Sequence, residues 1–273
     1  MSHTCAIIAG SGSFPAHVAQ EAKRQGLQVV VIGLKGWAEP TLARYADVYE
    51  ELAVGQLSAL IQRLKTHQIR EAVMAGKVTK GVLFDSQAHM DGETVGLLSR
   101  LSDFSVKSLL GAIAQRLAQE GITLLDSSTF LRDQLCPEGV LTARAPTDEE
   151  TEDIRVGVEA ARRIAELDVG QTVVVKRKVL VAVEALEGTD ATLRRAGQLA
   201  GPGCVVVKMA SPTQDRRFDL PVLGRQTLRV ATRIGAHCLA VEAHATLLLE
   251  KTALLAEAEA GQLSLVGIAP PSG

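Results

Sequence analysis

The chain has few aromatic residues, few cysteines and no long run of apolar residues. Aromatic residues make up 3% of its 273 positions, which argues against a surface that stacks the bases of single-stranded nucleic acid. Its 4 cysteines lie far apart without a C-x-x-C pair, so neither a disulfide framework nor a zinc site is expected. No apolar run approaches the roughly 18 residues that a membrane-spanning helix needs, and the N-terminal run is too short for a secretory signal. These absences predict a protein of a reducing compartment such as the cytoplasm.

The charge is nearly balanced, with 29 basic and 31 acidic residues and a formal net charge of -2. Such a balance provides no global attraction to nucleic acid or to anionic lipid. The 6 histidines show no HxH or HExxH spacing, and the sequence contains neither a GxSxG elbow nor a GxxxxGK[ST] loop. A zinc enzyme, a serine hydrolase with that elbow and a P-loop NTPase are therefore disfavoured.

Short apolar runs alternate with helical patterns along the first half of the chain. This alternation indicates a mostly parallel sheet covered by helices on both faces. The predicted strands are residues 5–9, 27–32, 72–75 and 122–125. Helices are predicted at residues 14–25 and 57–64, and apolar residues recur at helical spacing from residue 94 to residue 120.

A segment without clear periodicity, residues 126–147, contains two prolines and a glycine and indicates a domain boundary. The chain is longer than one typical domain, and its 47% hydrophobic content suffices for two cores. We therefore expect an N-terminal α/β domain over residues 1–130 and a C-terminal α/β domain over residues 131–273.

The second half begins with a capping-box pattern, in which the side chains of Thr147 and Glu150 can each bind the other's backbone amide. A helix is predicted from there to about Glu166. The strands predicted beyond it are residues 172–175, 179–183, 204–207, 238–241, 247–249 and 263–268. The further predicted helices are residues 191–199, 226–234 and 252–259.

A glycine-rich turn, AGSGSFP at residues 9–15, joins the first predicted strand to the first helix. Gly10, Ser11 and Gly12 can form a tight turn whose amides, with the helix N-terminus, receive a phosphate. Pro15 replaces the third glycine of the dinucleotide fingerprint, and the second strand ends without the acidic residue that binds a ribose. A phosphate- or ribose-binding turn is favoured over a purely structural turn, and NAD binding is the least favoured reading.

The third strand ends in a similar segment, AGKV at residues 75–78. Gly76 permits a close approach of the backbone, and Lys77 is predicted at the carboxyl edge of the sheet, where open α/β sheets bind ligands. A lysine that contacts phosphate and a lysine that is merely solvated fit this pattern equally well.

A loop that enters a helix, EGTD at residues 187–190, follows a strand in the second half. Thr189 or Asp190 is predicted as the N-cap, with Arg194 about one turn further on. A capped helix with surface arginines explains the pattern. The alternative is that Thr189 and Asp190 contact a ligand while Arg194 meets its phosphate, with Glu184 within reach of the same region.

A stiff, charged loop, KMASPTQDRRFDLPVLG at residues 208–224, follows a predicted buried strand. Its prolines exclude a helix interior, and charged groups on a loop after a buried strand are typical of reactive sites in α/β proteins. A solvated surface loop is the alternative. Its polar candidates are Lys208, Gln214, Asp215, Arg216, Arg217 and Asp219.

Five segments in a fixed order together resemble one family. They are AGSGSFP at residues 9–15, AGKV at 75–78, LDVGQTVVV at 167–175, VAVEALEGTDATLRR at 181–195 and QDRRFDLPVLG at 214–224. The sequence resembles the LpxI-type UDP-2,3-diacylglucosamine pyrophosphatases of lipid A biosynthesis, from the first strand to near the C-terminus.

This resemblance implies an N-terminal Rossmann-like parallel sheet and a C-terminal mixed α/β domain, with the substrate held between them. It implies a magnesium-dependent hydrolase that cleaves UDP-2,3-diacylglucosamine by attack of water at the α-phosphorus, giving UMP and 2,3-diacylglucosamine 1-phosphate. It also implies a cytoplasmic enzyme peripheral to the inner membrane of a Gram-negative bacterium. A homodimer is expected as the commonest oligomer.

The resemblance also assigns residues. The aspartate of the family's D-L-P-x-x-G motif is catalytic, and it is Asp219 here. Magnesium prefers oxygen ligands, and Asp219, Asp215, Asp190 and Glu184 are the candidate carboxylates, with Asp219 and Asp215 as the chosen ligands. The sequence leaves open whether Asp219 is a ligand or a general base. Ser211 stands where family members carry a lysine, so a phosphate contact there must come from another basic residue. The substrate-binding candidates are Gly10, Ser11, Gly12, Gly76, Lys77, Thr189, Asp190, Arg194, Lys208 and Gln214.

Two other functions remain open from the sequence alone. One is a nucleotide-sugar binding module without turnover, and the less favoured one is an NAD(P)-dependent oxidoreductase.

Overall fold

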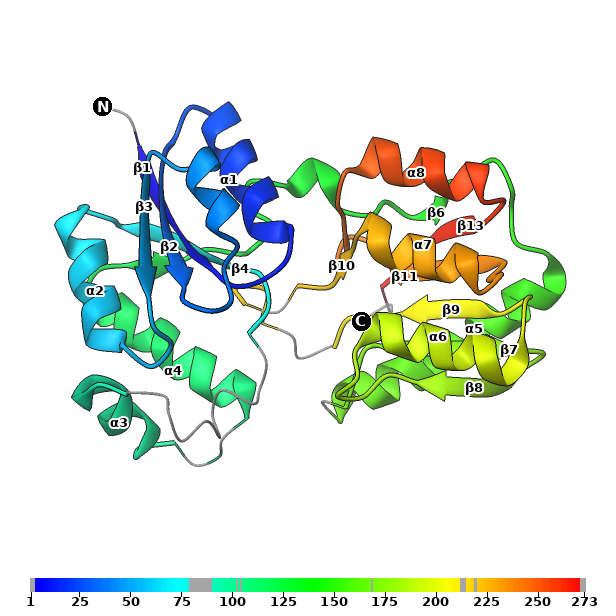
Figure 1. Cartoon of the computed structure of the whole chain (residues 1–273). Coiled ribbons are helices and arrows are strands. Elements are labelled where there is room, and N and C mark those ends of the chain that lie inside the picture. The colour runs from blue at the N-terminus through cyan, green and yellow to red at the C-terminus, as the bar shows by residue number, and fades with distance from the viewer. Residues whose placement is uncertain are drawn as a thin grey trace. The chain divides into compact units, whose positions relative to one another are not determined.

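The structure is a computed structural model that describes residues 3–78, 90–101, 103, 105–167, 169–211, 215–218 and 220–270. These residues form two compact units (Figure 1). The N-terminal unit comprises residues 3–131 together with residues 215–218 of a later loop, and the C-terminal unit comprises the other described residues. Asp219 and Gln214 lie outside the described residues.

The N-terminal unit is built on a sheet of parallel strands in the order β3-β2-β1-β4-β5. The strands are β1 (Thr4–Ala9), β2 (Gln28–Leu34), β3 (Val48–Leu52), β4 (Glu71–Ala75) and β5 (Thr123–Leu124). The helices are α1 (Phe14–Arg24), the 3-10 helix η1 (Pro40–Tyr45), α2 (Leu57–Thr66), α3 (Gly92–Leu98) and α4 (Val106–Gln119). From β1 the chain adds strands toward one edge of the sheet, and from β4 it adds them toward the other edge. Ligands of doubly wound sheets bind where the order of the strands reverses in this way, here between β1 and β4.

Both faces of this sheet are covered, as the sequence predicts. Ile8 and Ile32 face a core that α2 and α4 complete with Leu60 and Leu117. Helix α1 packs against β1, β2 and β4 from the same unit and buries Val18. Strands β1 and β2 are buried along nearly their whole length because helices cover them on both sides.

Two features of this unit differ from the sequence prediction. The helical periodicity between residues 94 and 120 belongs to two helices, because Asp91 caps α3 and Ser105 caps α4 through their side chains. Strand β3 is not predicted. It lies at the edge of the sheet, is only partly buried, and carries two adjacent glutamates that obscure the alternation of apolar residues.

The C-terminal unit contains a mixed sheet in the order β6-β13-β11-β9-β7-β8, in which β9, β11 and β13 are parallel. Its strands are β6 (Gly139–Val140), β7 (Thr172–Lys176), β8 (Val179–Val183), β9 (Val205–Lys208), β11 (Cys238–Glu242) and β13 (Ser264–Ile268). A small separate sheet joins β10 (Val222–Leu223) to β12 (Leu247–Leu248). The helices are the 3-10 helix η3 (Arg132–Gln134), α5 (Asp148–Glu166), α6 (Thr189–Ala200), α7 (Arg225–Arg233) and α8 (Lys251–Ala260).

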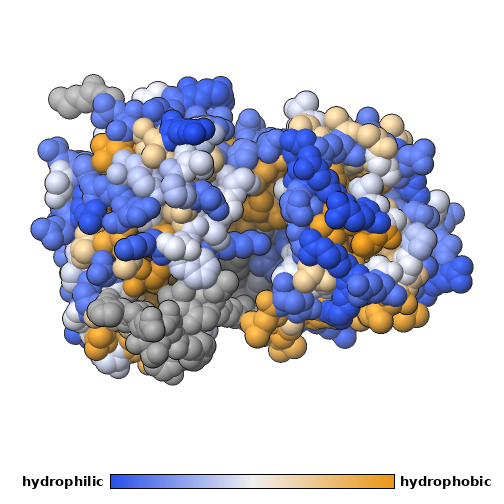
Figure 2. Space-filling model, in the orientation of Figure 1, coloured by the Kyte–Doolittle hydropathy of each residue, from blue (hydrophilic) through white to orange (hydrophobic). Residues whose placement is uncertain are grey.

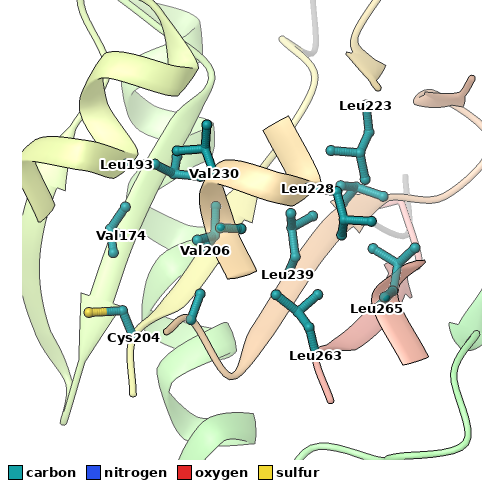
Figure 3. Close-up of a cluster of buried hydrophobic side chains, with 14 of the residues drawn as sticks. Val174, Leu193, Cys204, Val206, Leu223, Leu228, Val230, Leu239, Leu263 and Leu265 are labelled. Atoms are coloured by element: carbon teal, nitrogen blue, oxygen red, sulfur yellow. The ribbon is translucent and has the colours of Figure 1, made fainter. Parts of the chain in front are cut away.

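Helix α5 covers one face of this sheet, and α6, α7 and α8 cover the other. Figure 3 shows Leu193 of α6 and Val230 of α7 beside Val206 of β9 in the second of these cores. The predicted capping box of α5 is present, since Thr147 N donates to Glu150 Oε2 at 3.0 Å and Glu150 N donates to Thr147 Oγ1 at 3.2 Å. The expected α/β fold, with a parallel sheet followed by a mixed sheet, is confirmed.

The face of the C-terminal unit seen in Figure 2 is mainly hydrophilic along α7 and mixed over α8. Arg225 and Arg229 of α7 form ion pairs there with Glu257 of α8. Among the residues that the structure describes, no helix combines the length and the apolar character needed to cross a membrane.

Candidate functional site

The glycine turn after β1 and the AGK segment after β4 lie side by side at the carboxyl edge of the N-terminal sheet. Gly10 N donates to Ala75 O at 2.8 Å, and Ser11 and Lys77 exchange backbone hydrogen bonds of 2.9 and 3.0 Å. Ser11 Oγ also donates to Lys77 O at 2.9 Å. The structure therefore joins two of the predicted motifs at the reversal between β1 and β4.

This close approach explains two of the glycines. A Cβ on Gly10 would lie 2.7 Å from Lys77 O, and a Cβ on Gly76 would lie 2.7 Å from Gly10 C. Gly76 also has φ +93°, a conformation that side chains rarely adopt. Gly10 and Gly76 thus serve the packing of the two loops, whatever ligand binds beside them.

Gly12 and the start of α1 have more open surroundings. A Cβ on Gly12 would meet no atom within 4 Å. Ser13, the N-cap of α1, makes no side-chain capping hydrogen bond. The side chain of Lys77 is exposed at the same edge. An open helix N-terminus beside a lysine is an arrangement that can receive a phosphate.

A third segment at this edge is the part of the charged loop that belongs to the N-terminal unit, residues 215–218. Asp215 holds Arg217 through both carboxylate oxygens, at 2.9 Å to Nε and 2.6 Å to a terminal nitrogen. This guanidinium holds the pKa of Asp215 below its usual value. Both carboxylate oxygens of Asp215, predicted as a magnesium ligand, are therefore already paired with an arginine.

The turn after β5 binds this segment. Asp126 forms an ion pair with Arg216, with 3.0 Å between Oδ2 and Nε, and Ser127 N donates to Arg216 O at 2.9 Å. Asp126, Ser127 and Ser128 are not among the residues predicted from the sequence, which places them only in the boundary segment. An aspartate followed by two serines directly after a strand is the local signal that marks such a turn.

The carboxyl edge of the C-terminal sheet carries a second polar cluster. Lys208, at the end of β9, is only 8% exposed, and its Nζ donates to Thr189 Oγ1 at 3.2 Å. Thr189 Oγ1 in turn donates to Glu184 Oε1 at 2.8 Å. Glu184 and Lys208 both lie next to Thr172, through the hydrogen bond from Glu184 N to Thr172 O and through the register of β7 with β9. The structure thus brings together two of the predicted substrate-binding residues, Lys208 and Thr189, with Glu184.

The carboxylate of Glu184 is only half satisfied. Its Oε2 is shielded from solvent and has no hydrogen-bond partner among the described residues. Buried polar atoms are normally paired, so an unpaired carboxylate oxygen beside a buried lysine calls for a ligand, a water molecule or a cation.

Two other predicted residues of this unit lie on α6. Asp190 accepts a hydrogen bond of 2.7 Å from Thr227 of α7, a residue with no role predicted from the sequence. Arg194 is exposed, and no described residue forms a hydrogen bond or ion pair with its side chain. Gly188 occupies the N-cap position of α6, so the expected capping by Thr189 or Asp190 is wrong. The hydroxyl of Thr189 is instead used in the contact with Glu184 and Lys208.

Polar groups gather at the carboxyl edges of both sheets, with a glycine turn and an open helix N-terminus in one unit and a buried lysine with a carboxylate in the other. These features define a two-domain α/β protein whose sheet edges are suited to a phosphate-bearing ligand.

The chain belongs to the LpxI family. The model of the LpxI N-terminal domain matches residues 4–134, and the model of the LpxI C-terminal domain matches residues 137–266. A relative from Caulobacter vibrioides, the UDP-2,3-diacylglucosamine pyrophosphatase LpxI, is 30% identical in an alignment 276 residues long, and this alignment covers 97% of this chain and 97% of the relative. The resemblance inferred from the sequence motifs is confirmed.

Two solved structures match with much lower identity. The crystal structure of AnUbiX (PadA1) in complex with FMN and dimethylallyl pyrophosphate is 10% identical, with 45% of this chain and 77% of that chain covered and a TM-score of 0.24. CobK precorrin-6A reductase is 12% identical, with 100% of this chain and 89% of that chain covered and a TM-score of 0.26. Both TM-scores are too low to support an argument about the fold or the function of this chain.

Proposed function

We propose that this protein hydrolyses UDP-2,3-diacylglucosamine to UMP and 2,3-diacylglucosamine 1-phosphate in lipid A biosynthesis. Water attacks the α-phosphorus, the bond from this phosphorus to the bridging oxygen breaks, and the sugar phosphate leaves. The observation that carries the proposal is the match to the Caulobacter vibrioides pyrophosphatase along nearly the whole length of both chains. The phosphate-compatible edges of the two sheets support it.

Magnesium is the proposed cofactor. Among the described residues no three His, Cys, Asp or Glu side chains cluster to hold a metal, but magnesium needs only one or two carboxylates beside substrate phosphates and water. The buried, unpaired oxygen of Glu184 fits such a ligand. Asp219 is proposed as a second ligand, while Asp215 would first have to release Arg217. When bound, the cation would offset the negative charge that repels the attacking water.

Residues of this chain have the following proposed roles. Asp219 orients the water and accepts its proton, or binds the cation, as the family motif implies. The amides at Gly12 and the start of α1, with Lys77, bind one phosphate. Lys208, oriented by Thr189, contributes a positive charge to the diphosphate. Asp190, Arg194 and Gln214 remain proposed substrate contacts.

The reaction itself provides the test. Purified protein with magnesium should release UMP and 2,3-diacylglucosamine 1-phosphate in equal amounts from UDP-2,3-diacylglucosamine, and a chelator should stop the reaction until magnesium is restored. In water enriched in oxygen-18, attack at the α-phosphorus places the label in UMP. Label in the sugar phosphate would contradict the proposed site of attack. Binding of the substrate without release of UMP would instead indicate a binding module.

Replacing Lys208 by methionine should lower kcat/KM by about tenfold to a hundredfold. The substitution keeps an unbranched apolar side chain but removes the charge, and a hydrogen bond to a charged group contributes about 1.5–3 kcal/mol. Steady-state rates of UMP release measure the change.

Lys176→Met is the matched control, because Lys176 lies at the opposite end of the same sheet, where its Nζ donates to Ala200 O and Pro202 O. We expect this control to lose stability while its folded fraction keeps kcat/KM. Equal activity losses in both variants would contradict the role of Lys208.

A peripheral contact with the inner membrane and a homodimer are proposed alongside this activity, because the substrate is a lipid and closed dimers are the commonest oligomers. Flotation of the protein with phospholipid vesicles and its sedimentation velocity would test them separately. The position of the substrate between the two domains stays a prediction.

A further inference from the structure

The loop between β9 and β10 belongs to both units of the chain. Residues 215–218 group with the N-terminal unit, although the strands on either side of them belong to the C-terminal unit. Asp219, the proposed catalytic residue, directly follows this segment in the sequence. The contacts that hold residues 215–218 are therefore candidates for positioning Asp219.

Ser127 makes the backbone contacts that hold this segment. Its N–H donates to Arg216 O at 2.9 Å, and its Oγ lies 2.9 Å from Arg217 O. The same Oγ lies 2.9 Å from Met74 O on β4, so its one hydrogen serves two carbonyl acceptors. Ser127 is only 2% exposed, and loss of its hydroxyl would leave these contacts without replacement by water.

The neighbours of Ser127 hold the side chain of Arg216. Asp126 Oδ2 forms the ion pair with this arginine, and an Arg216 terminal nitrogen donates to Ser128 Oγ at 3.3 Å. Asp126 Oδ1 accepts hydrogen bonds of 2.7 Å from Ser128 N and 2.5 Å from Ser128 Oγ. Asp126–Ser128 thus forms a closed turn in which the middle residue binds the backbone of the loop and the outer residues bind a side chain.

Two segments of the proposed site meet at the hydroxyl of Ser127. Met74 lies two positions before Gly76, whose loop packs against the glycine turn. Arg217 lies two positions before Asp219, and each residue extends the chain by at most about 3.6 Å. Ser127 therefore fixes the carbonyl of Arg217 to the end of β4, two residues before Asp219 in the sequence.

We propose that Ser127 is a positioning residue for the hydrolysis, which holds the segment before Asp219 against the ends of β4 and β5. The proposal rests on the proposed function for its catalytic part. Ser127 is not itself a proposed substrate contact. It acts by holding the segment before Asp219, and a displacement of about 1 Å at a reacting group can cost a hundredfold in rate.

Ser127→Ala tests the proposal through two readouts. We expect kcat for UMP release to fall between about tenfold and a hundredfold while KM changes little, because substrate contacts remain. We also expect trypsin to cleave the folded variant after Arg216 or Arg217 about tenfold faster than the unmodified protein. The variant lacks the buried hydrogen bond of the Ser127 hydroxyl, so less free energy is needed to open the segment. Mass spectrometry of the fragments locates the cleavage without any need for activity.

Ser264→Ala is the matched control. Ser264 is also fully buried, its Oγ donates to a backbone carbonyl, Arg144 O, at 2.9 Å, and it lies at the amino end of β13 in the other unit. It should lose stability without a change in kcat or in cleavage at residues 216–217. Ser127→Cys, which keeps the volume and replaces the hydroxyl by a weak donor, covers the case in which the alanine variant does not fold.

Each outcome decides the proposal. Faster cleavage with a lower kcat supports it. Unchanged cleavage at residues 216–217 in both Ser127 variants would show that Ser127 does not hold the segment. Faster cleavage with an unchanged kcat would show that holding the segment does not matter for the hydrolysis. If the unmodified protein releases no UMP, the proposed function and the catalytic part of this inference both fail, and the cleavage rates still decide whether Ser127 anchors the loop.

Discussion

Replacement of Asp219 by asparagine should lower kcat for UMP release by about a thousandfold. The amide has the shape of the carboxylate but neither its charge nor its basicity, so it can neither take a proton from water nor bind magnesium well. Folding should be unchanged, as checked by circular dichroism and thermal unfolding. A variant with full activity would remove Asp219 from the proposed mechanism.

The same variant distinguishes the two roles left open for Asp219. If the aspartate is a magnesium ligand, residual activity should need a much higher magnesium concentration. If it is a general base, the magnesium requirement should stay the same and the acidic limb of the pH–rate profile should disappear. Asp215→Asn is the matched control. Because Asp215 is already paired with Arg217, its loss should loosen the loop and reduce kcat far less than the loss of Asp219.

Gly76→Ala should destabilise the N-terminal unit by about 2–5 kcal/mol. A positive φ costs a residue with a side chain about 1–2 kcal/mol, and forcing a methyl group into packed backbone costs about 1–3 kcal/mol more. The new Cβ would lie 2.7 Å from both Gly10 C and Ser11 O and 2.9 Å from Pro15 Cγ. Because these neighbours are backbone atoms and a proline ring, they cannot move aside cheaply.

The single tryptophan, Trp37, makes this measurement specific to one unit. Urea unfolding followed by tryptophan fluorescence reports on the N-terminal unit. The unfolding of the two domains is then not analysed as a single two-state transition. Gly12→Ala is the control, since Gly12 has φ +94° but no atom within 4 Å of an added Cβ. The difference between the two variants isolates the cost of crowding, and equal destabilisation would contradict the packing role of Gly76.

Much of the fold is predictable from the sequence because periodicity and caps are local properties. The strand before the glycine turn, the helix with Pro15 in its first turn, and the capping box of α5 all appear as predicted. The predictions are wrong or incomplete where polar residues interrupt the pattern. Ser105 divides one helical pattern into two helices, and adjacent glutamates obscure β3.

The candidate site is predictable only in part. Motifs at strand ends identify Gly10, Gly76 and Lys208, because residues after buried strands lie at a sheet edge. Thr227 carries no such motif, and the Asp-Ser-Ser run around Ser127 indicates a turn but not what that turn contacts. Their importance comes from partners 37 and 90 residues away in the sequence, Asp190 and Arg217, which nothing local to either residue indicates.

The linear order of residues is enough to assign this protein to its family and to an α/β fold, since motif spacing and the burial pattern of each strand are written in short stretches of chain. Which loops meet is a different kind of information. The pairing of Ser11 with Lys77 across 66 residues, and of Ser128 with Arg216 across 88, follows from strand order and from the closure of long loops. These depend on the packing of whole helices against a sheet, so only the folded chain reveals that the turn after β5 holds the segment preceding Asp219.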